Sequence, residues 1–226
     1  MTVHGVREAT RDDELAWMLG GSLLVGATVL PLVLQPVAFA VGGSSVLWAA
    51  MLAAALLILA FGVRGAGSIT ARRPLGTITL TALAVLNVTM AVLWLTPMLA
   101  ADHPTAEYLA VTATITQVDL ALRFALALVA TTQIARAGVV PRPWNRAPLW
   151  CLAAVTVAWL IQIVVRPSAT MDPAALSWTV TLGGTISSLA TIFLGVLAIA
   201  LANRHAGARG ARTAGGLEAH ARAHDR

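Results

Sequence analysis

The sequence predicts an all-α, polytopic integral membrane protein: a bundle of six transmembrane helices with both termini in the cytoplasm. Three observations support this fold class. Of the 226 residues, 58% are hydrophobic and only 11% are charged, whereas a soluble domain has about 25% charged residues. The apolar residues form six long stretches joined by short connections, and the arginines concentrate in alternate connections. Continuous apolar stretches favour helices over the alternating strands of a membrane barrel.

Each apolar stretch is long enough, or nearly so, to cross a hydrocarbon layer that requires about 20 residues. Together they form one predicted transmembrane domain, residues 15–202, flanked by cytoplasmic tails at 1–14 and 203–226. The second tail is rich in Arg, Ala and Gly, so we expect it to be disordered and attracted to anionic lipid headgroups. The predicted helices are Leu15–Val41, Val46–Val63, Leu75–Leu99, Leu109–Ala135, Leu149–Val165 and Trp178–Ala202.

The first stretch has one alternative interpretation. Ala38, Phe39 and Ala40 resemble a signal-peptide cleavage site. The apolar stretch before them is far longer than the roughly 7–15 residues of a signal-peptide core. We therefore predict that the first helix is retained. Cleavage would leave five helices and place the N-terminus outside.

The arginines predict the orientation. All 15 basic residues are arginine, and 13 of them lie in the two tails or in the connections after the second and fourth stretches. Only Arg166 lies on the opposite side, with Asp102, Glu107 and Asp172. Positively charged short loops stay in the cytoplasm. Both termini are therefore predicted on the cytoplasmic side of the cytoplasmic (inner) membrane. The 13 arginines are Arg7, Arg11, Arg64, Arg72, Arg73, Arg136, Arg142, Arg146, Arg204, Arg209, Arg212, Arg222 and Arg226.

A polar site is predicted near the middle of the bilayer. Asp119 and Arg123 are the only charged residues inside the six stretches. They are one helical turn apart, so the carboxylate can accept hydrogen bonds from the guanidinium. Asn87 in the third stretch, Gln117 in the fourth and Ser188 in the sixth lie at similar depth. If these helices are neighbours, the five side chains form one polar cluster.

Two interpretations of the Asp119–Arg123 pair remain open. Ionisable residues in membranes usually mark a transport path or a binding site. On that interpretation, the pair binds or releases a proton, an ion or a polar solute. On the other interpretation, the neutral pair is an internal staple that fixes helix rotation, since buried ion pairs often add little net stability.

The sixth stretch also predicts a helix-packing face. Gly183, Ser187, Thr191 and Gly195 recur at steps of four and therefore share one face of a helix. Small residues let helix backbones approach closely in membranes. The partner helix belongs either to the same chain or to another protein.

Several chemistries are disfavoured. The chain has no lysine for a Schiff base, no histidine inside a stretch for a membrane haem, and no phosphate-binding loop. The hydrolase patterns Gly-x-Ser-x-Gly and His-Glu-x-x-His are absent as well. We expect no cofactor, no metal site and no nucleic-acid partner. The expected partners are the lipid bilayer and either another membrane protein or a second copy of the chain. The single cysteine, Cys151, excludes an intrachain disulfide.

The segment 136–144, with Pro141 and Pro143, looks like a hairpin loop common in small actinobacterial multi-span proteins of uncharacterised function. The resemblance covers this loop alone. It implies a proline-stiffened cytoplasmic turn and no activity.

Three functions are compatible with these patterns. The first is a small permease, or a permease subunit, that moves a polar or protonatable solute past the Asp–Arg pair. The second is a non-catalytic scaffold or accessory subunit assembled through the Gly183–Gly195 face. The third is an enzyme acting on a lipid or isoprenoid with Asp119 as acid or base. The sequence favours a role other than catalysis, since none of the common catalytic patterns is present.

Overall fold

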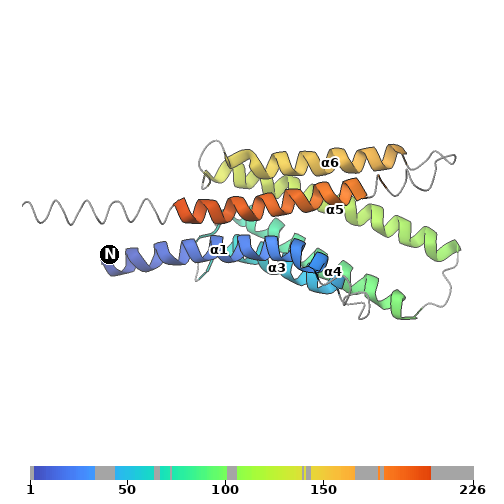
Figure 1. Ribbon diagram of the computed structural model, residues 1–226, viewed down its shortest axis with the longest axis horizontal. Coiled ribbons are helices and arrows are strands. Elements are labelled where there is room, and N and C mark those ends of the chain that lie inside the picture. Colours follow the sequence, from blue (N-terminus) through green and yellow to red (C-terminus); the bar gives the residue numbers. More distant parts are fainter. Residues whose placement is uncertain are drawn as a thin grey trace, which may run out of the picture.

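The computed structural model describes residues 3–33, 44–63, 67–71, 73–100, 106–138, 140, 144–165, 178 and 181–204. Within these ranges the chain forms long α-helices joined by short connections, which confirms the predicted all-α membrane fold. The helices lie side by side along one axis (Figure 1). They are α1 (Val3–Val33), α3 (Ser44–Phe61), α4 (Pro74–Ala100), α5 (Ala106–Ala137), α6 (Ala147–Val165) and an unlabelled C-terminal helix (Thr181–Arg204). A short 3-10 helix, η1 (Trp144–Arg146), precedes α6.

Five of the described helices are long and apolar enough to cross a membrane. The shorter one is α3, with 18 residues. At 1.5 Å per residue it extends about 27 Å, which is close to the ~30 Å hydrocarbon core of a bilayer. Helix α3 packs against both α1 and α4, and it occupies the place of the second predicted span.

The first helix differs from its predicted range. The described helix α1 begins at Val3, and its apolar spanning part is Asp12–Pro31. The polar residues before that part are therefore helical too, since backbone hydrogen bonding does not require apolar side chains. Helix α1 continues through Pro31 and ends at Val33. The rest of the predicted first span, residues 34–41, lies outside the described residues, as do Pro141, Pro143 and the tail after Arg204.

Glycine ends two helices at the same end of the bundle. Gly62 follows α3 with a φ of 74°, and Gly138 follows α5 with a φ of 68°. Residues with side chains rarely adopt this left-handed conformation. The Gly62 amide donates to the Ile58 carbonyl at 2.8 Å, which satisfies one of the carbonyls left open at the helix end. Pro74 then begins α4, where its missing amide hydrogen costs nothing.

The helices form a closed ring. Each of α1, α3, α4, α5 and α6 packs against the next one along the chain. The C-terminal helix closes the ring from both sides. Its Gly195 lies against Gly21 of α1, and its Gly183 lies against Gln162 of α6. A central space lined by all of these helices follows from this arrangement.

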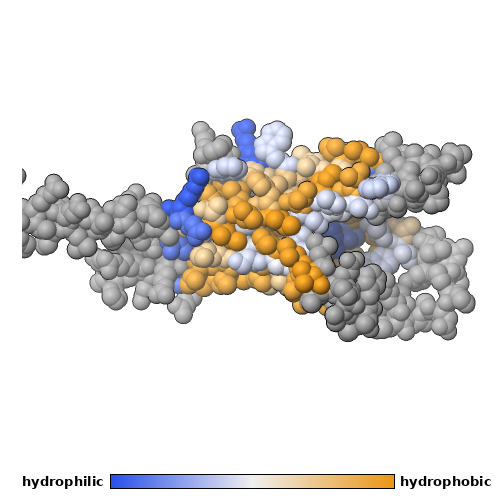
Figure 2. Space-filling model, in the orientation of Figure 1, coloured by the Kyte–Doolittle hydropathy of each residue, from blue (hydrophilic) through white to orange (hydrophobic). Residues whose placement is uncertain are grey.

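Small side chains dominate the packed interior. Alanine is the commonest buried apolar residue, as at Ala16, Ala27, Ala55 and Ala60. Large apolar side chains lie mostly on the outside, where they form the orange surface in Figure 2. This distribution is typical of membrane helices, because lipid tails are as apolar as a leucine side chain and close backbone approach provides the association.

The basic residues gather at one end of the bundle. Arg73, Arg136, Arg146 and Arg204 are exposed, and each lies at or beside a helix end. Figure 1 shows these helix ends on the same side as the start of α1, and Figure 2 shows blue side chains there. Both described ends of the chain therefore lie on one side, as an even number of spans requires. We refer to this side as the basic end.

Candidate functional site

Three of the predicted polar residues form one hydrogen-bonded cluster between α4 and α5. The Arg123 Nε donates to Asp119 Oδ1 at 2.9 Å and to Asp119 Oδ2 at 2.7 Å. The Arg123 Nη1 donates to Asn87 Oδ1 on α4. The Asn87 Nδ2 in turn donates to the Leu83 carbonyl at 2.8 Å. We call Asn87, Asp119 and Arg123 the polar cluster.

The helix geometry explains why these residues meet. Asp119 and Arg123 are separated by four positions on α5, so they lie on one face, which packs against α4. Asn87 is only 6% exposed, and a buried amide without partners would be costly. Its oxygen and nitrogen are both hydrogen bonded. The cluster is neutral overall, which lowers the cost of keeping its charges away from water.

The other two predicted members lie elsewhere. Gln117 is exposed on α5, and Ser188 is half-buried on the C-terminal helix. Among the described residues, neither one hydrogen bonds to the polar cluster. Gln117 is two positions before Asp119, so it points to the opposite side of α5 at about 100° per residue. Helical geometry applied to the sequence could have excluded Gln117, but it could not have placed Ser188.

A cavity of about 350 Å³, which is partly open rather than fully enclosed, lies among the helices of the ring. Every long helix contributes to its lining, for example Leu24 of α1, Leu56 of α3 and Ser187 of the C-terminal helix. Leu83 and Ala127 line the cavity one helical turn from Asn87 and Arg123 respectively. The polar cluster therefore lies about one turn beyond these two lining residues, a rise of about 6 Å along a helix, and its own residues are not part of the lining. The sequence did not indicate this cavity.

The connection between α3 and α4 covers the cavity at the basic end. Ile69 lines the cavity and packs against all three buried hydrophobic clusters of the described chain. Its amide donates to the Leu59 carbonyl at 3.0 Å. Thr70 is fully buried, and its hydroxyl lies 3.2 Å from that of Thr77 and 3.0 Å from that of Ser68. These bonds hold the connection in place as a floor beneath the cavity.

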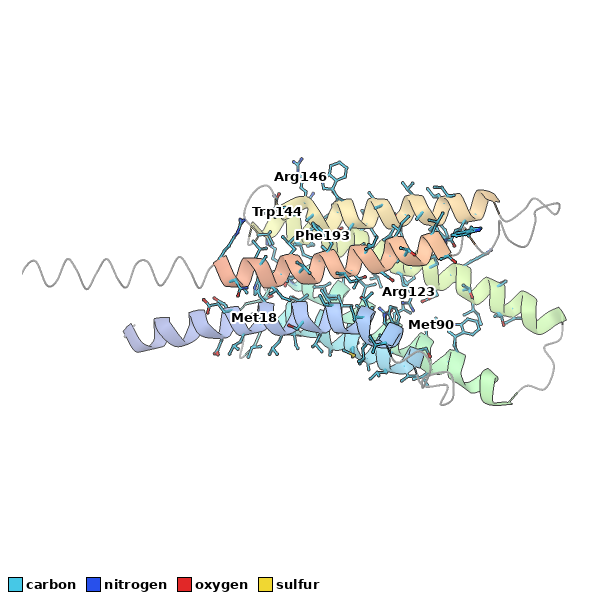
Figure 3. All side chains as sticks on the ribbon, viewed as in Figure 1. Met18, Met90, Arg123, Trp144, Arg146 and Phe193 are labelled. Carbon is cyan, nitrogen blue, oxygen red and sulfur yellow. The ribbon has the colours of Figure 1, made fainter. Side chains whose placement is uncertain are left out.

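The polar cluster can be seen from the side of the bundle. Figure 3 labels Arg123 between the C-terminal helix and the layer formed by α1 and α3. At the same place, Figure 2 shows a strongly hydrophilic patch beside paler blue side chains. The side chains of Arg123 and Asp119 are 25% and 15% exposed. The polar cluster is therefore partly accessible from the side of the bundle and lies about one helical turn from the cavity lining at Leu83 and Ala127.

The predicted packing face of the C-terminal helix contacts α1, α6 and the cavity at different positions. A Cβ on Gly195 would lie 2.7 Å from the Gly21 carbonyl oxygen, so Gly195 packs directly against the backbone of α1. Gly183 instead faces the Gln162 side chain of α6. Ser187 and Thr191, between the two glycines, line the cavity. The partner helices of both glycines belong to the same chain.

Comparison of the chain with models of known protein families, with curated proteins and with solved structures gives no match.

Replacing Asn87 with leucine is expected to lower the free energy of unfolding by about 2 kcal/mol, because the variant loses a hydrogen bond to a charged group and leaves an Arg123 donor unpaired. Unfolding of the purified protein in detergent, followed by tryptophan fluorescence, measures the change. Thr81→Val is the control on the same helix, since the Thr81 hydroxyl donates only to the Thr77 carbonyl of its own helix. Equal stability of the two variants would show that the Arg123–Asn87 bond contributes nothing.

Proposed function

We propose that the protein is a small permease, or the membrane subunit of one, located in the cytoplasmic membrane and moving a protonatable solute past the polar cluster. The observation that supports this is the position of the cluster. Asp119 and Arg123 are partly exposed on the side of the bundle, and the hydrogen-bonded cluster with Asn87 lies about one helical turn from the lining of the cavity. A staple between helices does not require that position, whereas a polar constriction on a path does.

The cluster has the chemistry for a proton-coupled step. Both oxygens of Asp119 accept from Arg123, and Arg123 also donates to Asn87. Protonation of Asp119 would remove its charge and weaken its hold on the guanidinium. Arg123 donors would then become available to an acceptor on the solute, and loss of the proton would restore the pair and release the solute. The same residues thus alternate between a closed and a solute-binding arrangement.

Asp119→Asn tests this function, because asparagine keeps the size and an acceptor oxygen but cannot exchange a proton at physiological pH. We expect the variant to fold and to lose transport. The measurement is a comparison of small-molecule levels inside and outside cells that express the native protein, Asp119→Asn or neither. At least one weak acid or amine should redistribute with the native protein only. A profile for Asp119→Asn that matches the native protein would exclude the proposal.

A second candidate function is supported by one observation on α5. Gln117 is exposed on this helix within its apolar spanning part, and a polar amide facing lipid is unfavourable. Contact with another membrane protein, or with a second copy, would satisfy it. An accessory role predicts that Gln117→Leu weakens co-purification with that partner. If the chain remains monomeric in mild detergent with or without the substitution, this candidate fails.

A further inference from the structure

We infer that the central cavity binds an uncharged, mainly apolar molecule, and that the transported solute enters it as the neutral form of a weak acid or amine. The inference rests on the proposed function, because it names the class of solute that fits the same path. It begins from the cavity volume of about 350 Å³, which falls within the roughly 300–1,000 Å³ range of small-molecule sites. A partly open space of this size among the helices is large enough to admit a small molecule.

The lining determines the chemistry of that occupant. The described side chains around the cavity are almost all aliphatic or aromatic, and none of them is charged. Three hydroxyl residues, Thr131, Ser187 and Thr191, also lie on the wall. The hydroxyls of Thr131 and Thr191 each donate to a carbonyl of their own helix. Little in the cavity can therefore replace the water around a charge. A charged solute would bind poorly there, whereas its neutral form would gain by leaving water.

The polar cluster could bind the ionisable end of a solute whose apolar part lies in the cavity. Leu83 and Ala127 on the wall are one turn from Asn87 and Arg123, a rise of about 6 Å along a helix. A solute with one ionisable end and an apolar body could therefore place its body in the cavity while its polar end reaches the cluster. Ile69 and its hydrogen-bonded connection cover the opposite end. A bound molecule would be held between this floor and the polar cluster.

The sole cysteine provides a direct test, since Cys151 is half-buried and lines the cavity. The rate of Cys151 alkylation by N-ethylmaleimide, followed by intact mass, would report occupancy. Three probes share one apolar chain: decanol is neutral, decyltrimethylammonium is a permanent cation, and decanoic acid is neutral only at acidic pH. Native mass spectrometry of the same samples counts retained probe molecules, so the test does not depend on the reactivity of Cys151.

Two phenylalanine substitutions on α5 provide the matched comparison. Ala127→Phe fills the cavity, whereas Ala125→Phe adds the same side chain at an exposed position two residues away. Ala190→Phe, also on the cavity wall, replaces Ala127→Phe if the latter does not fold. We expect decanol to slow alkylation several-fold in the native protein and in Ala125→Phe, and to have no effect in the cavity-filled variant. Decanoic acid should protect at acidic pH and lose this effect at alkaline pH.

Three results would overturn the inference. They are the absence of retained decanol, equal protection by decyltrimethylammonium, and undiminished protection in a folded cavity-filled variant. The failure of this inference can be distinguished from that of the proposed function. If Asp119→Asn loses transport but the native protein binds no probe, the permease function is supported and the apolar binding site is excluded. If the native protein binds the probe but Asp119→Asn transports normally, the apolar binding site is supported and the permease function is excluded.

Discussion

Replacing Asp119 alone with leucine is expected to lower the free energy of unfolding by about 3 kcal/mol, because the substitution leaves the Arg123 charge without its counter-ion inside the bundle. We place the effect at the lower end of the range for broken buried pairs, since the Arg123 side chain is 25% exposed. Chemical unfolding in detergent, followed by tryptophan fluorescence, measures it. This loss should be the largest among single substitutions in the polar cluster.

The matched control is the double variant Asp119→Leu with Arg123→Leu. Removing both charges leaves only the Asn87 oxygen without its donor, so we expect the double variant to be more stable than Asp119→Leu. A double variant that is less stable than Asp119→Leu would mean that Arg123 contributes through packing or through Asn87 rather than through the ion pair.

Replacing Gly195 with leucine is expected to destabilise the protein by about 3 kcal/mol or more, because overpacking forces the backbone to move. A Cβ at this position would lie 2.7 Å from the Gly21 carbonyl oxygen and 2.8 Å from a methyl carbon of Val25. The α1 backbone cannot move away as a flexible side chain can, so the ring would open at its closing contact. Thermal unfolding and the yield of folded protein after gel filtration measure the loss.

Gly184→Leu is the control on the same helix, because nothing lies within 4 Å of a Cβ at Gly184. We expect the free energy of unfolding of this variant to lie within about 1 kcal/mol of that of the native protein, because surface substitutions usually have small effects. If Gly195→Leu instead remained as stable as Gly184→Leu and lost a partner protein, the Gly195 face would be an intermolecular interface and the ring closure would be wrong.

The sequence could predict the fold class because the bilayer imposes a length and a composition on each helix, as α4 and α5 show. It could also predict the Asp119–Arg123 pair, since four positions on a helix fix their proximity. Asn87 was found only through its depth along the helix. Helix rotation is harder to predict than depth: Gln117 lies at the depth of Asp119, but two steps of about 100° turn it to the opposite side of α5, where it is exposed.

The ring and its cavity were beyond sequence reasoning for a physical reason. In a membrane helix, both the lipid face and the packed face are apolar, so the pattern of residues does not show which side points inward. The C-terminal helix illustrates this, because its stripe of small residues meets α1 at Gly195, α6 at Gly183 and the cavity between them. Small size identified these positions as packing sites but not their partners.

Exchanging the two charges, Asp119→Arg with Arg123→Asp, tests most directly whether the pair carries transport or only holds the helices. The exchanged pair keeps its spacing of four on α5, and the Asn87 amide can donate to a carboxylate as well as accept from a guanidinium. A staple would therefore survive the exchange. We predict that the free energy of unfolding of the exchanged variant lies within about 1 kcal/mol of that of the native protein. We also predict that this variant no longer transports the solute that the native protein moves. Native transport by the exchanged variant would contradict the account.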